Sequence, residues 1–487
     1  MTDVYVVSTY RPRFCGIAEF SANLVKGFKR ARRSDESIGN VYVVAIDNNR
    51  QRTEYGRDVS LVINQYDESS WVKSANAIAG KDGKKVVLAN MEYGIIGDYD
   101  SRQDNLTPFM KTLNERGVPV VVQVHTVKGE NIDQYNTDVL RNSSKYGKAI
   151  TIMSQIAGDM LSQEPYSLEG KIEYISHGVR AHERYSETDR RNVKSKYGLD
   201  GMIVVANFGY NSPNKGREYG NIGHLEFLKT LSESQRKRVV KIDSHGPHEG
   251  FASKEGGKYW IEYDSRFKAL ITNSGLRWLE VSQSQFKKLT RQDFEKHDVV
   301  LINRTLDNKT FGECFIMSDL IINPTRDPWQ ITSGIRAETQ GYGRAGIFSS
   351  SLDSMENFMP GEAVIKEVIG KKKHATRLDE KRHIWDKSSG IVVDLIPSNG
   401  HDLLGIEPNL PVLDIEEIAA AEYYLLVGND NQRTDMEDRS REKGRGIPWT
   451  RVALRYSRLF QEISEEEESK KEKLLYLKER DGQESIA

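Results

Sequence analysis

Apolar runs of strand length recur through the first part of the chain, separated by amphipathic stretches. In chain order they read VYVVST, VYVVAI, KVVLAN, VPVVVQV and AITIM. Between the first two, the segment from Ile17 places Phe20, Leu24 and Phe28 at helical spacing. Continuous apolar strands that alternate with helices are typical of a parallel sheet covered on both faces. The pattern therefore predicts a doubly wound α/β domain.

The same pattern starts again after a polar region at residues 182–200. A run over residues 202–209 ends in glycine, and VVKIDS, DVVLIN, DLIINP, AGIFSS and GIVVDL follow it. We therefore expect two tandem Rossmann-like, doubly wound α/β domains, at residues 1–195 and 196–448. A charged and aromatic segment near residues 246–296 is expected to be an insertion or an elaborated loop of the second domain.

The C-terminal residues 449–487 are expected to form a helix followed by a charged tail. Four apolar side chains share one face at helical spacing, and they are Val452, Tyr456, Leu459 and Ile463. This face should be buried. The acidic and basic run SEEEESKKEK that follows should be solvated.

Composition narrows the class of protein. At 487 residues the chain is too long for one core. The net charge of −1, from 70 basic and 71 acidic residues, argues against a dedicated nucleic-acid binder. Only Cys15 and Cys314 are present, which suits a reducing cytosol rather than a disulfide framework. The sequence shows neither an apolar run long enough to cross a bilayer nor the features of a signal peptide, so we expect a cytoplasmic protein.

Open parallel sheets bind ligands beyond the carboxyl ends of their strands, so residues directly after strands are candidates for a site. Gly16 follows the first predicted strand and precedes a helix. Glycine there lets a backbone approach a ligand, and the helix start favours an anion, although packing alone also explains such a glycine. His125 ends an apolar strand, where a functional and a structural role fit equally well.

The second half of the chain repeats this arrangement in NFGYNSPNKGRE. Gly209 ends the predicted strand, and Lys215 stands just before the next helix. A lysine beside a helix start is well placed to neutralise a phosphate. A surface lysine in a turn is the simpler account of the motif taken alone.

Residues 326–346, RDPWQITSGIRAETQGYGRAG, place a polar helix start between the apolar runs DLIINP and GIFSSS. Thr332 or Ser333 can cap the helix, and Gly334 leaves N–H groups open to phosphate or sugar oxygens. Glu338 lies about one turn further along the helix. A carboxylate there can accept hydrogen bonds from two vicinal ribose hydroxyls.

Two interpretations of this stretch remain open. It is either a ligand site at a helix start or a capped helix that faces the core and carries an incidental glutamate. Gly341 and Gly343 favour the first interpretation, because a core-facing helix gives no evident reason for two glycines so close together.

In combination, these motifs resemble the family 4 glycosyltransferases, which are retaining enzymes of the GT-B fold. RPRFCGIAEFSANL is similar to the family's proline–cysteine–glycine–isoleucine–alanine opening. MEYGIIG resembles the glutamate–tyrosine–glycine segment of one subgroup. VHTVKGE, IMSQIA, YISHGV and FGYNSPNKG follow in the expected order, and residues 326–346 resemble the donor-site loop and helix. The ordered series covers nearly the whole chain and is more specific than any single motif.

The resemblance implies that a nucleotide-sugar donor binds mainly to the second domain and that a sugar, glycoside or lipid-linked acceptor binds to the first. Lys215 should contact the donor diphosphate, Gly16 should offer its amide to it, and Glu338 should bind the ribose. His125 should lie beside the transferred sugar. The helix from Trp449 should cross back to the first domain.

The implied site residues fall into three groups. The donor-binding group is Gly16, Gly209, Lys215, Thr332, Ser333, Gly334 and Glu338. The group assigned to the chemical step is His125, Lys215 and Gln330. The acceptor-side group is Arg11, Glu92 and Tyr93.

The sequence also departs from the family pattern. The family usually has two glutamates eight residues apart in this helix region, and Gln330 replaces the first of them. A neutral glutamine can hydrogen-bond a sugar hydroxyl but cannot stabilise a developing positive charge. Tyr210 stands where many members carry a phosphate-binding arginine. Neutralisation of the diphosphate would then depend more on Lys215, helped by Arg217 or Arg11.

Retaining transfer in this fold is understood to proceed on one face of the sugar, with the departing diphosphate helping to take the acceptor proton. The protein then contributes positioning and electrostatic stabilisation. No cofactor is expected. No metal is expected either, because Asp98 and Asp100 in GDYD match only a short Asp-x-Asp pattern of a different, single-sheet class of transferases. Relatives with the Glu-Tyr-Gly segment are often mannosyltransferases, which favours a GDP-mannose donor.

Two other functions fit the same sequence. One is a nucleotide-sugar epimerase of the same fold, which would release an epimerised sugar without an acceptor. The other is a non-catalytic nucleotide-sugar-binding protein, which Gln330 and Tyr210 suggest. We expect no nucleic-acid partner, and association with a membrane surface only if the acceptor is a lipid.

Overall fold

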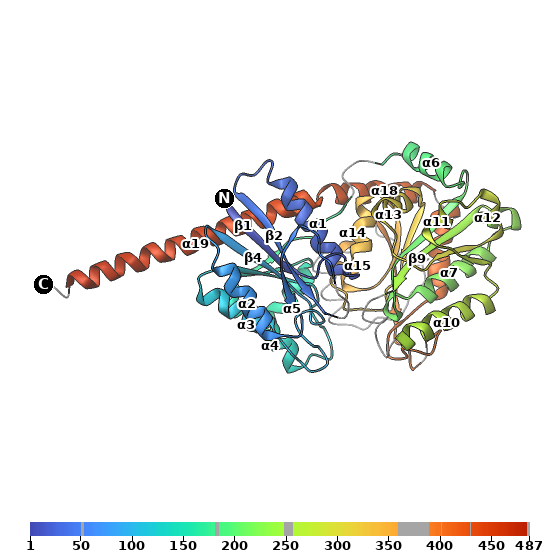
Figure 1. Cartoon of the computed structure of the whole chain (residues 1–487). Helices are drawn as coiled ribbons and strands as arrows, with labels where there is room; N and C mark the ends of the chain where they lie inside the picture. Colours follow the sequence, from blue (N-terminus) through green and yellow to red (C-terminus); the bar gives the residue numbers. More distant parts are fainter. Residues whose placement is uncertain are drawn as a thin grey trace. The chain divides into compact units, whose positions relative to one another are not determined.

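The computed structural model describes residues 1–49, 53–180, 185–247, 257–358, 389–400, 402–428 and 430–484. The chain forms two compact units. The first consists of residues 1–178 and 449–487, and the second of residues 179–448 (Figure 1). Each unit contains a parallel sheet of seven strands with helices on both faces, which confirms the predicted pair of doubly wound α/β domains.

The first sheet follows the strand order β3-β2-β1-β4-β5-β6-β7. Its strands are β1 (Thr2–Ser8), β2 (Ile38–Asp47), β3 (Val59–Asn64), β4 (Lys85–Met91), β5 (Val120–Val124), β6 (Ala149–Ile152) and β7 (Ile172–Tyr174). The five predicted runs form β1, β2, β4, β5 and β6. The pattern did not reveal β3 and β7, which lie at the two edges and are only partly buried.

Helices cover both faces of this sheet (Figure 1). They are α1 (Gly16–Ala31), α2 (Glu68–Ala79), α3 (Leu106–Glu115), α4 (Gln134–Tyr146), α5 (Gln155–Ser162) and α19 (Trp449–Glu484). On one face α1 packs along α19, where the rings of Phe28 and Phe460 stack with centroids 6.1 Å apart. Helices α2, α3 and α4 lie side by side over the other face.

The C-terminal helix belongs to the first unit, as expected. Its predicted apolar face is buried in the core that α1 and the sheet share, at Val452, Tyr456, Leu459 and Ile463. The Tyr456 hydroxyl donates a hydrogen bond to the buried Gln123 side chain of β5. Burial of this face fixes the returning chain against the first sheet.

The second sheet follows the order β10-β11-β9-β8-β12-β13-β14. Its strands are β8 (Ile203–Asn211), β9 (Val239–Pro247), β10 (Trp278–Glu280), β11 (Val299–Ile302), β12 (Leu320–Asn323), β13 (Gly346–Ser349) and β14 (Gly390–Val393). A small antiparallel pair, β15 (Leu395–Ile396) and β16 (Val412–Leu413), stands apart from it. The predicted runs form every strand of the large sheet except β10.

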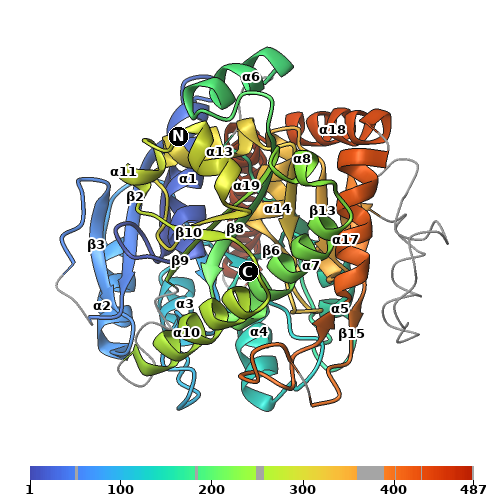
Figure 2. The ribbon, with the colours of Figure 1, turned by 90° about the vertical axis from the view of Figure 1, so that its right-hand side faces the viewer.

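Alternate side chains of the second sheet enter two different cores. Val205 and Leu320 pack with α7, α10 and α17, whereas Val204 and Ile321 pack with α11, α12 and α13. Figure 2 shows the ribbons of α7, α10 and α17 and of α11 and α13. The helical segments of this unit are α6 (Glu187–Lys196), η1 (Pro213–Lys215), α7 (Arg217–Lys229), α8 (Glu233–Arg236), α10 (Lys258–Asn273), α11 (Gln283–Phe286), α12 (Arg291–Lys296), α13 (Asn308–Met317), α14 (Gly334–Gly341), α15 (Leu352–Phe358), α17 (Ile415–Tyr423), η4 (Tyr424–Gly428) and α18 (Asp430–Arg445). Among the described residues, no helix has the length and apolar character that crossing a membrane requires.

The expectation of an elaborated loop near residues 246–296 is wrong for the described part of that segment. It forms α10, α11 and α12, and β10 pairs with β11 as an edge strand of the main sheet. Charged residues obscured this pattern because they lie on exposed helix faces. Buried aromatic residues, such as Phe267 and Phe286, anchor the helices.

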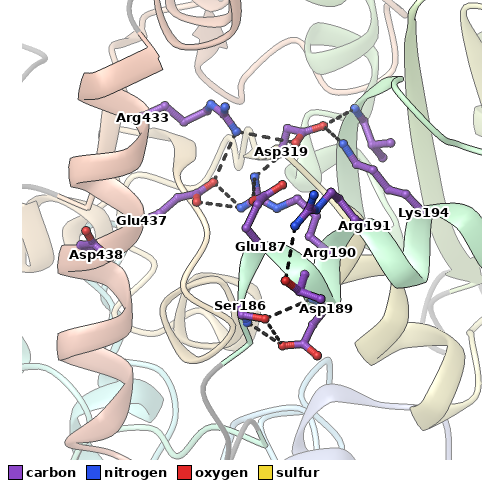
Figure 3. A network of polar contacts seen from close by, with 12 residues as sticks. Ser186, Glu187, Asp189, Arg190, Arg191, Lys194, Asp319, Arg433, Glu437 and Asp438 are labelled. Carbon is purple, nitrogen blue, oxygen red and sulfur yellow. Dashed lines mark hydrogen bonds and ion pairs between the residues drawn. The ribbon is translucent and has the colours of Figure 1, made fainter.

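The domain boundary lies earlier than residue 195, because α6 belongs to the second unit. Arg190 of α6 donates to both carboxylate oxygens of Glu437 in α18 at 2.7 Å. Lys194 binds Asp319, at the start of β12, at 2.6 Å. Figure 3 shows that α6 and α18 each contribute acidic and basic side chains to this network, Arg433 of α18 among them. These partners are too distant in sequence for a local pattern to reveal them.

We expect Glu437→Ala to lower the thermal unfolding midpoint by several degrees. Truncation leaves the buried Arg190 without its shortest partner, a loss that typically costs about 3–5 kcal/mol. Glu187→Ala is the matched control, because Glu187 also contacts Arg190, at 3.4 Å, but its side chain is 64% exposed. Exposed pairs contribute about 0–1 kcal/mol. Equal shifts in the two variants, measured by calorimetry, would contradict this account.

Candidate functional site

Two loops meet at the point in the second sheet where the strand order changes direction, between β8 and β12. Ligands of open α/β sheets bind at such points. Gly216 has a φ of +57°, and a Cβ there would lie 2.0 Å from Pro324 O, so no side chain fits. Asn214 O accepts hydrogen bonds from Arg326 N at 2.8 Å and Thr325 Oγ1 at 3.0 Å. The two loops are thus held in direct contact.

Lys215 lies in this joint, as the last residue of η1. It is half-buried. Its backbone N–H donates a hydrogen bond to Ser212 O at 2.9 Å, but within the described part of the chain its side chain makes neither a hydrogen bond nor a salt bridge. Burial lowers the pKa of Lys215, and the nearby Asp327 partly offsets that effect. A partly desolvated ammonium group with no salt-bridge partner is suited to bind an anion.

The start of α14 lies beyond the second loop. Ser333 is the N-cap, and its Oγ accepts a hydrogen bond from Arg336 N at 3.3 Å, which confirms the predicted cap. Gly334 is the first helical residue, and Thr332 precedes the cap; both are half-buried. First-turn N–H groups have no acceptor within their own helix, so this helix start favours negative charge.

Glu338 is buried on α14, and its carboxylate already has a protein partner. The backbone N–H of Arg180 lies 3.2 and 3.3 Å from its two oxygens, and Arg180 Nε lies 3.2 Å from Oε1. Burial raises the pKa of Glu338 to about 7, although Arg180 acts in the opposite direction. A carboxylate has about four acceptor positions, so Glu338 can still accept hydrogen bonds from hydroxyl groups of a ligand.

Gln330 lies in the loop that follows β12. Its backbone N–H donates to Asp327 O at 3.4 Å, and its carbonyl accepts from Asp353 N at 2.8 Å, so the main chain is fixed. The side-chain Oε1 is buried and has no hydrogen-bond partner among the described residues. An unsatisfied buried acceptor is costly, and such groups concentrate at functional sites.

The structure explains Gly341, the last residue of α14, and Gly343, just beyond it, by packing and backbone conformation, which corrects the interpretation that they favour a ligand site. A Cβ at Gly341 would lie 2.8 Å from Val179 Cβ. Gly343 has a φ of +62°, and a Cβ there would lie 2.0 Å from Arg441 Cγ. Close approach and a left-handed backbone therefore require glycine at both positions, whatever α14 binds.

Arg217 does not help Lys215, because it is fully buried in a polar network beneath the loop. Its Nε donates to Asp243 Oδ1 at 2.7 Å, and its Nη2 donates to Asn303 Oδ1 at 2.9 Å. Its guanidinium carbon lies 4.2 Å from the centre of the Phe267 ring. Arg217 therefore supports the fold, and the expectation that it neutralises a phosphate is wrong.

Asp243 and His245 belong to the polar network around Arg217, and the sequence did not identify either of them. Asp243 lies in the middle of β9 and His245 near its carboxyl end, next to β8, where His245 pairs in register with Gly209. The two residues are separated by one position, so they share a face of the strand, and His245 Nδ1 lies 2.7 Å from Asp243 Oδ1. The sequence feature that could have revealed these residues is an aspartate two positions before a histidine near the end of a predicted strand.

In the first unit, Gly16 opens α1 after β1. Cys15 is the N-cap of this helix, and its Sγ accepts a hydrogen bond from Ala18 N at 3.3 Å. Arg11 lies in the same loop, and its Nε donates to Glu19 Oε1 at 2.7 Å. Gly16 therefore occupies the predicted helix start, and Arg11 is held by a carboxylate of the first turn.

His125 follows β5 and faces the end of β4. Its backbone N–H donates to Met91 O at 3.0 Å, and its Nε2 lies 2.7 Å from Asn90 Oδ1. Phe20 contacts the ring edge-on, with centroids 4.8 Å apart. Burial, and after it the neighbouring His177, lowers the pKa of His125 to about 3. The imidazole is therefore neutral at physiological pH.

The residues of the Glu-Tyr-Gly segment face different surroundings. Tyr93 is buried, and its hydroxyl donates to Asn136 O at 3.3 Å, so it anchors α4. Glu92 is half-buried and accepts a hydrogen bond from Thr126 Oγ1. Of this pair, only Glu92 has the exposure needed for contact with an acceptor substrate.

Asp98 and Asp100 lie in a turn. Asp98 accepts hydrogen bonds from Asp100 N at 3.2 Å and from Ser101 Oγ at 3.0 Å, so its carboxylate caps its own loop. Among the described residues, no group of three or more His, Cys, Asp or Glu side chains is arranged to hold a metal ion.

The predicted site residues thus form two sets, one in each unit. The set at the β8–β12 switch point is Gly209, Lys215, Gln330, Thr332, Ser333, Gly334 and Glu338. The set at the carboxyl edge of the first sheet is Arg11, Gly16, Glu92, Tyr93 and His125. Arg180 was missed, because nothing near it in the sequence marks a partner for Glu338, 158 positions away.

The chain matches no protein-family model and no curated protein sequence. Solved structures match it over almost its whole length. HepE from Anabaena, in complex with UDP and glucose, has a TM-score of 0.61 at 11% identity, with 95% of this chain and 100% of HepE covered. Sucrose-phosphate synthase from Thermosynechococcus elongatus has a TM-score of 0.61 at 12% identity, with 95% and 99% covered.

A third similar structure is the UDP-forming trehalose-phosphate synthase from Burkholderia xenovorans, in complex with glucose-6-phosphate. Its TM-score is 0.58 at 11% identity, with 95% of this chain and 100% of the synthase covered. Together with the two seven-stranded parallel sheets, these likenesses establish a GT-B fold.

The depressed pKa of His125 predicts a dependence of stability on pH. The unfolded chain takes up a proton at His125 near pH 6.5, whereas the folded chain does so only near pH 3. This contribution is complete above pH 6.5 and is lost as the pH falls towards 3. Between pH 7 and pH 5, wild type should lose up to about 2 kcal/mol more than His125→Gln. Urea denaturation at both pH values measures the difference, and identical losses would show that folding does not lower the pKa of His125.

Proposed function

We propose that the protein is a retaining glycosyltransferase that moves a hexose from a nucleotide-diphosphate sugar to an acceptor. The donor binds at the β8–β12 switch point of the second unit. The observation that carries the proposal is Lys215, a half-buried lysine without a salt-bridge partner, on the loop between β8 and α7. The resemblance of the surrounding motifs to family 4 glycosyltransferases supports the same assignment.

The groups at this edge of the sheet suit the parts of a nucleotide sugar. Lys215 and the N–H groups at the start of α14 bind the diphosphate. Glu338 accepts hydrogen bonds from the ribose hydroxyls through the acceptor positions that Arg180 leaves open. Gln330 offers its unpaired Oε1 to a hydroxyl of the transferred hexose.

The donor base and sugar are proposed from the similar structures. UDP, UDP-glucose or a UDP-forming reaction is named for several of them, so UDP-glucose is the first donor to test. GDP-mannose, which the Glu-Tyr-Gly segment favours, is the second. Glucose-6-phosphate, present in one similar structure, is a reasonable first acceptor.

The chemical step needs no protein nucleophile. The departing diphosphate takes the acceptor proton on the face of the sugar where the new bond forms, so configuration is retained. Lys215 and the helix N–H groups stabilise the charge on the leaving diphosphate. His125, neutral and oriented by Asn90, is assigned to the transferred sugar by the family resemblance.

A second candidate function is nucleotide-sugar binding without transfer. It is favoured by Gln330, a neutral group where the family usually has a carboxylate. Incubation with UDP-glucose, GDP-mannose and a panel of acceptor sugars distinguishes the two functions. Release of UDP or GDP together with a new glycoside supports transfer, whereas saturable binding without turnover supports the binding protein.

Lys215→Ala should weaken UDP-glucose binding about 10- to 100-fold, since a charge-assisted contact contributes about 1.5–3 kcal/mol. Its thermal unfolding midpoint should stay close to that of wild type, because the Lys215 side chain makes no hydrogen bond or salt bridge within the described chain. Lys229→Ala is the control, a lysine at the far end of α7 that pairs with Glu226. If calorimetry gives the same affinity for both variants, Lys215 is not a phosphate ligand.

Glu338 and Gln330 should affect different kinetic constants. A ribose contact binds ground state and transition state equally, so Glu338→Ala should raise the donor KM about 10-fold or more with a smaller effect on kcat. Gln330→Ala should lower kcat and change the preference among sugars that carry the same nucleotide. Gln330→Glu, which restores the usual carboxylate, should be tolerated. The two assignments are reversed if Gln330→Ala selectively weakens binding of free UDP while Glu338→Ala leaves the donor KM unchanged.

Transfer should be independent of divalent metal ions. The Asp98 carboxylate is already used within its own turn, and Lys215 with the start of α14 supplies the positive charge that a metal would otherwise bring to the diphosphate. Full activity should therefore survive dialysis against EDTA. Activity that is lost and then restored by Mn²⁺ or Mg²⁺ would assign Asp98 and Asp100 a function in the reaction.

A further inference from the structure

A buried carboxylate in the middle of β9 organises the groups beneath the proposed donor site. Asp243 Oδ1 accepts hydrogen bonds from Arg217 Nε and from His245 Nδ1, each at 2.7 Å, and Oδ2 accepts one from Asn221 Nδ2 at 2.5 Å. Burial alone would raise the pKa of Asp243, but Arg217, His245 and Lys241 together hold it well below its usual range. Asp243 is therefore an ionised acceptor.

This arrangement fixes which nitrogen of His245 carries the proton. An ionised carboxylate can only accept, so the Nδ1 that faces Asp243 is the N–H nitrogen. Burial lowers the pKa of His245, and the positive charges of Arg217 and Lys241 lower it further. The carboxylate of Asp243 partly offsets this by raising it. In the neutral ring, Nε2 then carries the lone pair and is a hydrogen-bond acceptor.

His245 Nε2 is buried and has no hydrogen-bond partner within the described chain. It lies beside the backbone of Gly209, its register partner on β8. A Cβ at Gly209 would lie 3.5 Å from Nε2, within ordinary contact, so a side chain there would cover this nitrogen. Gly209 itself is partly exposed, and a ligand atom over its backbone would come next to the imidazole.

The position of His245 matters more than the unpaired nitrogen alone. His224 shows the same chemistry, with Nδ1 2.6 Å from Glu422 Oε2 and an unpaired, buried Nε2. However, His224 lies within α7 and contacts Glu422 of α17, so it does not belong to a strand of the sheet. His245 lies near the carboxyl end of β9, the strand beside β8 at the switch point, where open sheets bind their ligands.

We propose that His245 is a further ligand-contacting residue of the donor site, whose Nε2 accepts a hydrogen bond from an O–H or N–H group of the nucleotide sugar. This inference deepens the proposed function and depends on it. Asp243 is a positioning residue that sets the tautomer, and Arg217 holds Asp243. A hydroxyl of the transferred sugar and an N–H of the base are the two possible sources of the hydrogen.

The test measures binding of UDP and UDP-glucose by calorimetry to the full chain and three variants. His245→Phe keeps a ring but removes the acceptor, and Asp243 retains Arg217 and Asn221 as partners. It should bind UDP-glucose about 3- to 10-fold more weakly than wild type, as expected for loss of one hydrogen bond. His245→Gln, which restores an acceptor, should recover part of the affinity. His224→Phe should lower the thermal unfolding midpoint and leave affinity unchanged.

Comparison of the two ligands identifies the source of the hydrogen. A loss confined to UDP-glucose assigns it to the hexose, and an equal loss for UDP assigns it to the nucleoside. Repeating the titration in buffers of different ionisation enthalpy should show no proton uptake at His245. Should binding instead protonate the ring in wild type but not in His245→Gln, His245 would be a donor to phosphate, and the proposal would be overturned.

The remaining outcomes separate this inference from the proposed function. If wild type binds UDP-glucose and His245→Phe binds it equally well, the inference fails and the proposed function stands. If wild type binds neither UDP-glucose nor GDP-mannose, both fail together. If His245→Phe does not fold, His245→Leu takes its place: affinity equal to that of His245→Gln would overturn the inference, and weaker binding than that of His245→Gln would support it.

Discussion

The close contact between Gly216 and Pro324 is the constraint on which the second unit's candidate site depends. A Cβ at Gly216 would lie 2.0 Å from Pro324 O, so the loop after β8 and the loop after β12 touch through their backbones. This contact places Lys215, the residue before Gly216, beside the chain that leads to Gln330 and α14. Any side chain at position 216 would separate the two loops and the groups they carry.

Buried charged side chains stabilise the loop after β12 and the loop after β8. Arg326, on the loop after β12, lies 3.4 Å from Glu218 Oε1 in the first turn of α7 and donates to the carbonyl oxygens of Glu407, Leu410 and Pro411. Burial raises the pKa of Glu218 to about 7, and Arg326 acts against this. Such pairs contribute less to net stability than their number suggests, since desolvation offsets attraction. Their contribution here is to fix the direction in which the loops leave the sheet.

Sequence patterns predicted the strands and helices whose burial produces a regular pattern of apolar residues along the chain. Central strands such as β5 and β8 are continuous apolar runs, because both of their faces are buried. The returning helix α19 was predictable from the spacing of Tyr456 and Leu459. The edge strands β3 and β10 were missed, because partial exposure removes the continuous apolar signal.

The sequence predicted those site residues that lie directly after a strand or at the start of a helix. Lys215 and Ser333 lie at such positions, and the structure confirms that Ser333 caps α14. The partners of these groups were not predictable, because they are distant in sequence. Arg180 contacts Glu338 from 158 positions away, and Arg217 is held beneath the site by hydrogen bonds to Asp243 and Asn303. A single sequence does not encode such pairings in any local pattern.

A crystal structure of the full chain grown with millimolar UDP-glucose tests the central claim most directly. The account predicts electron density for a diphosphate within hydrogen-bonding distance of Lys215 Nζ and of the first N–H groups of α14. It also predicts that the ribose lies next to the Glu338 carboxylate. Ligand density at the carboxyl edge of the first sheet alone, with no ligand atom near Lys215, would contradict the account.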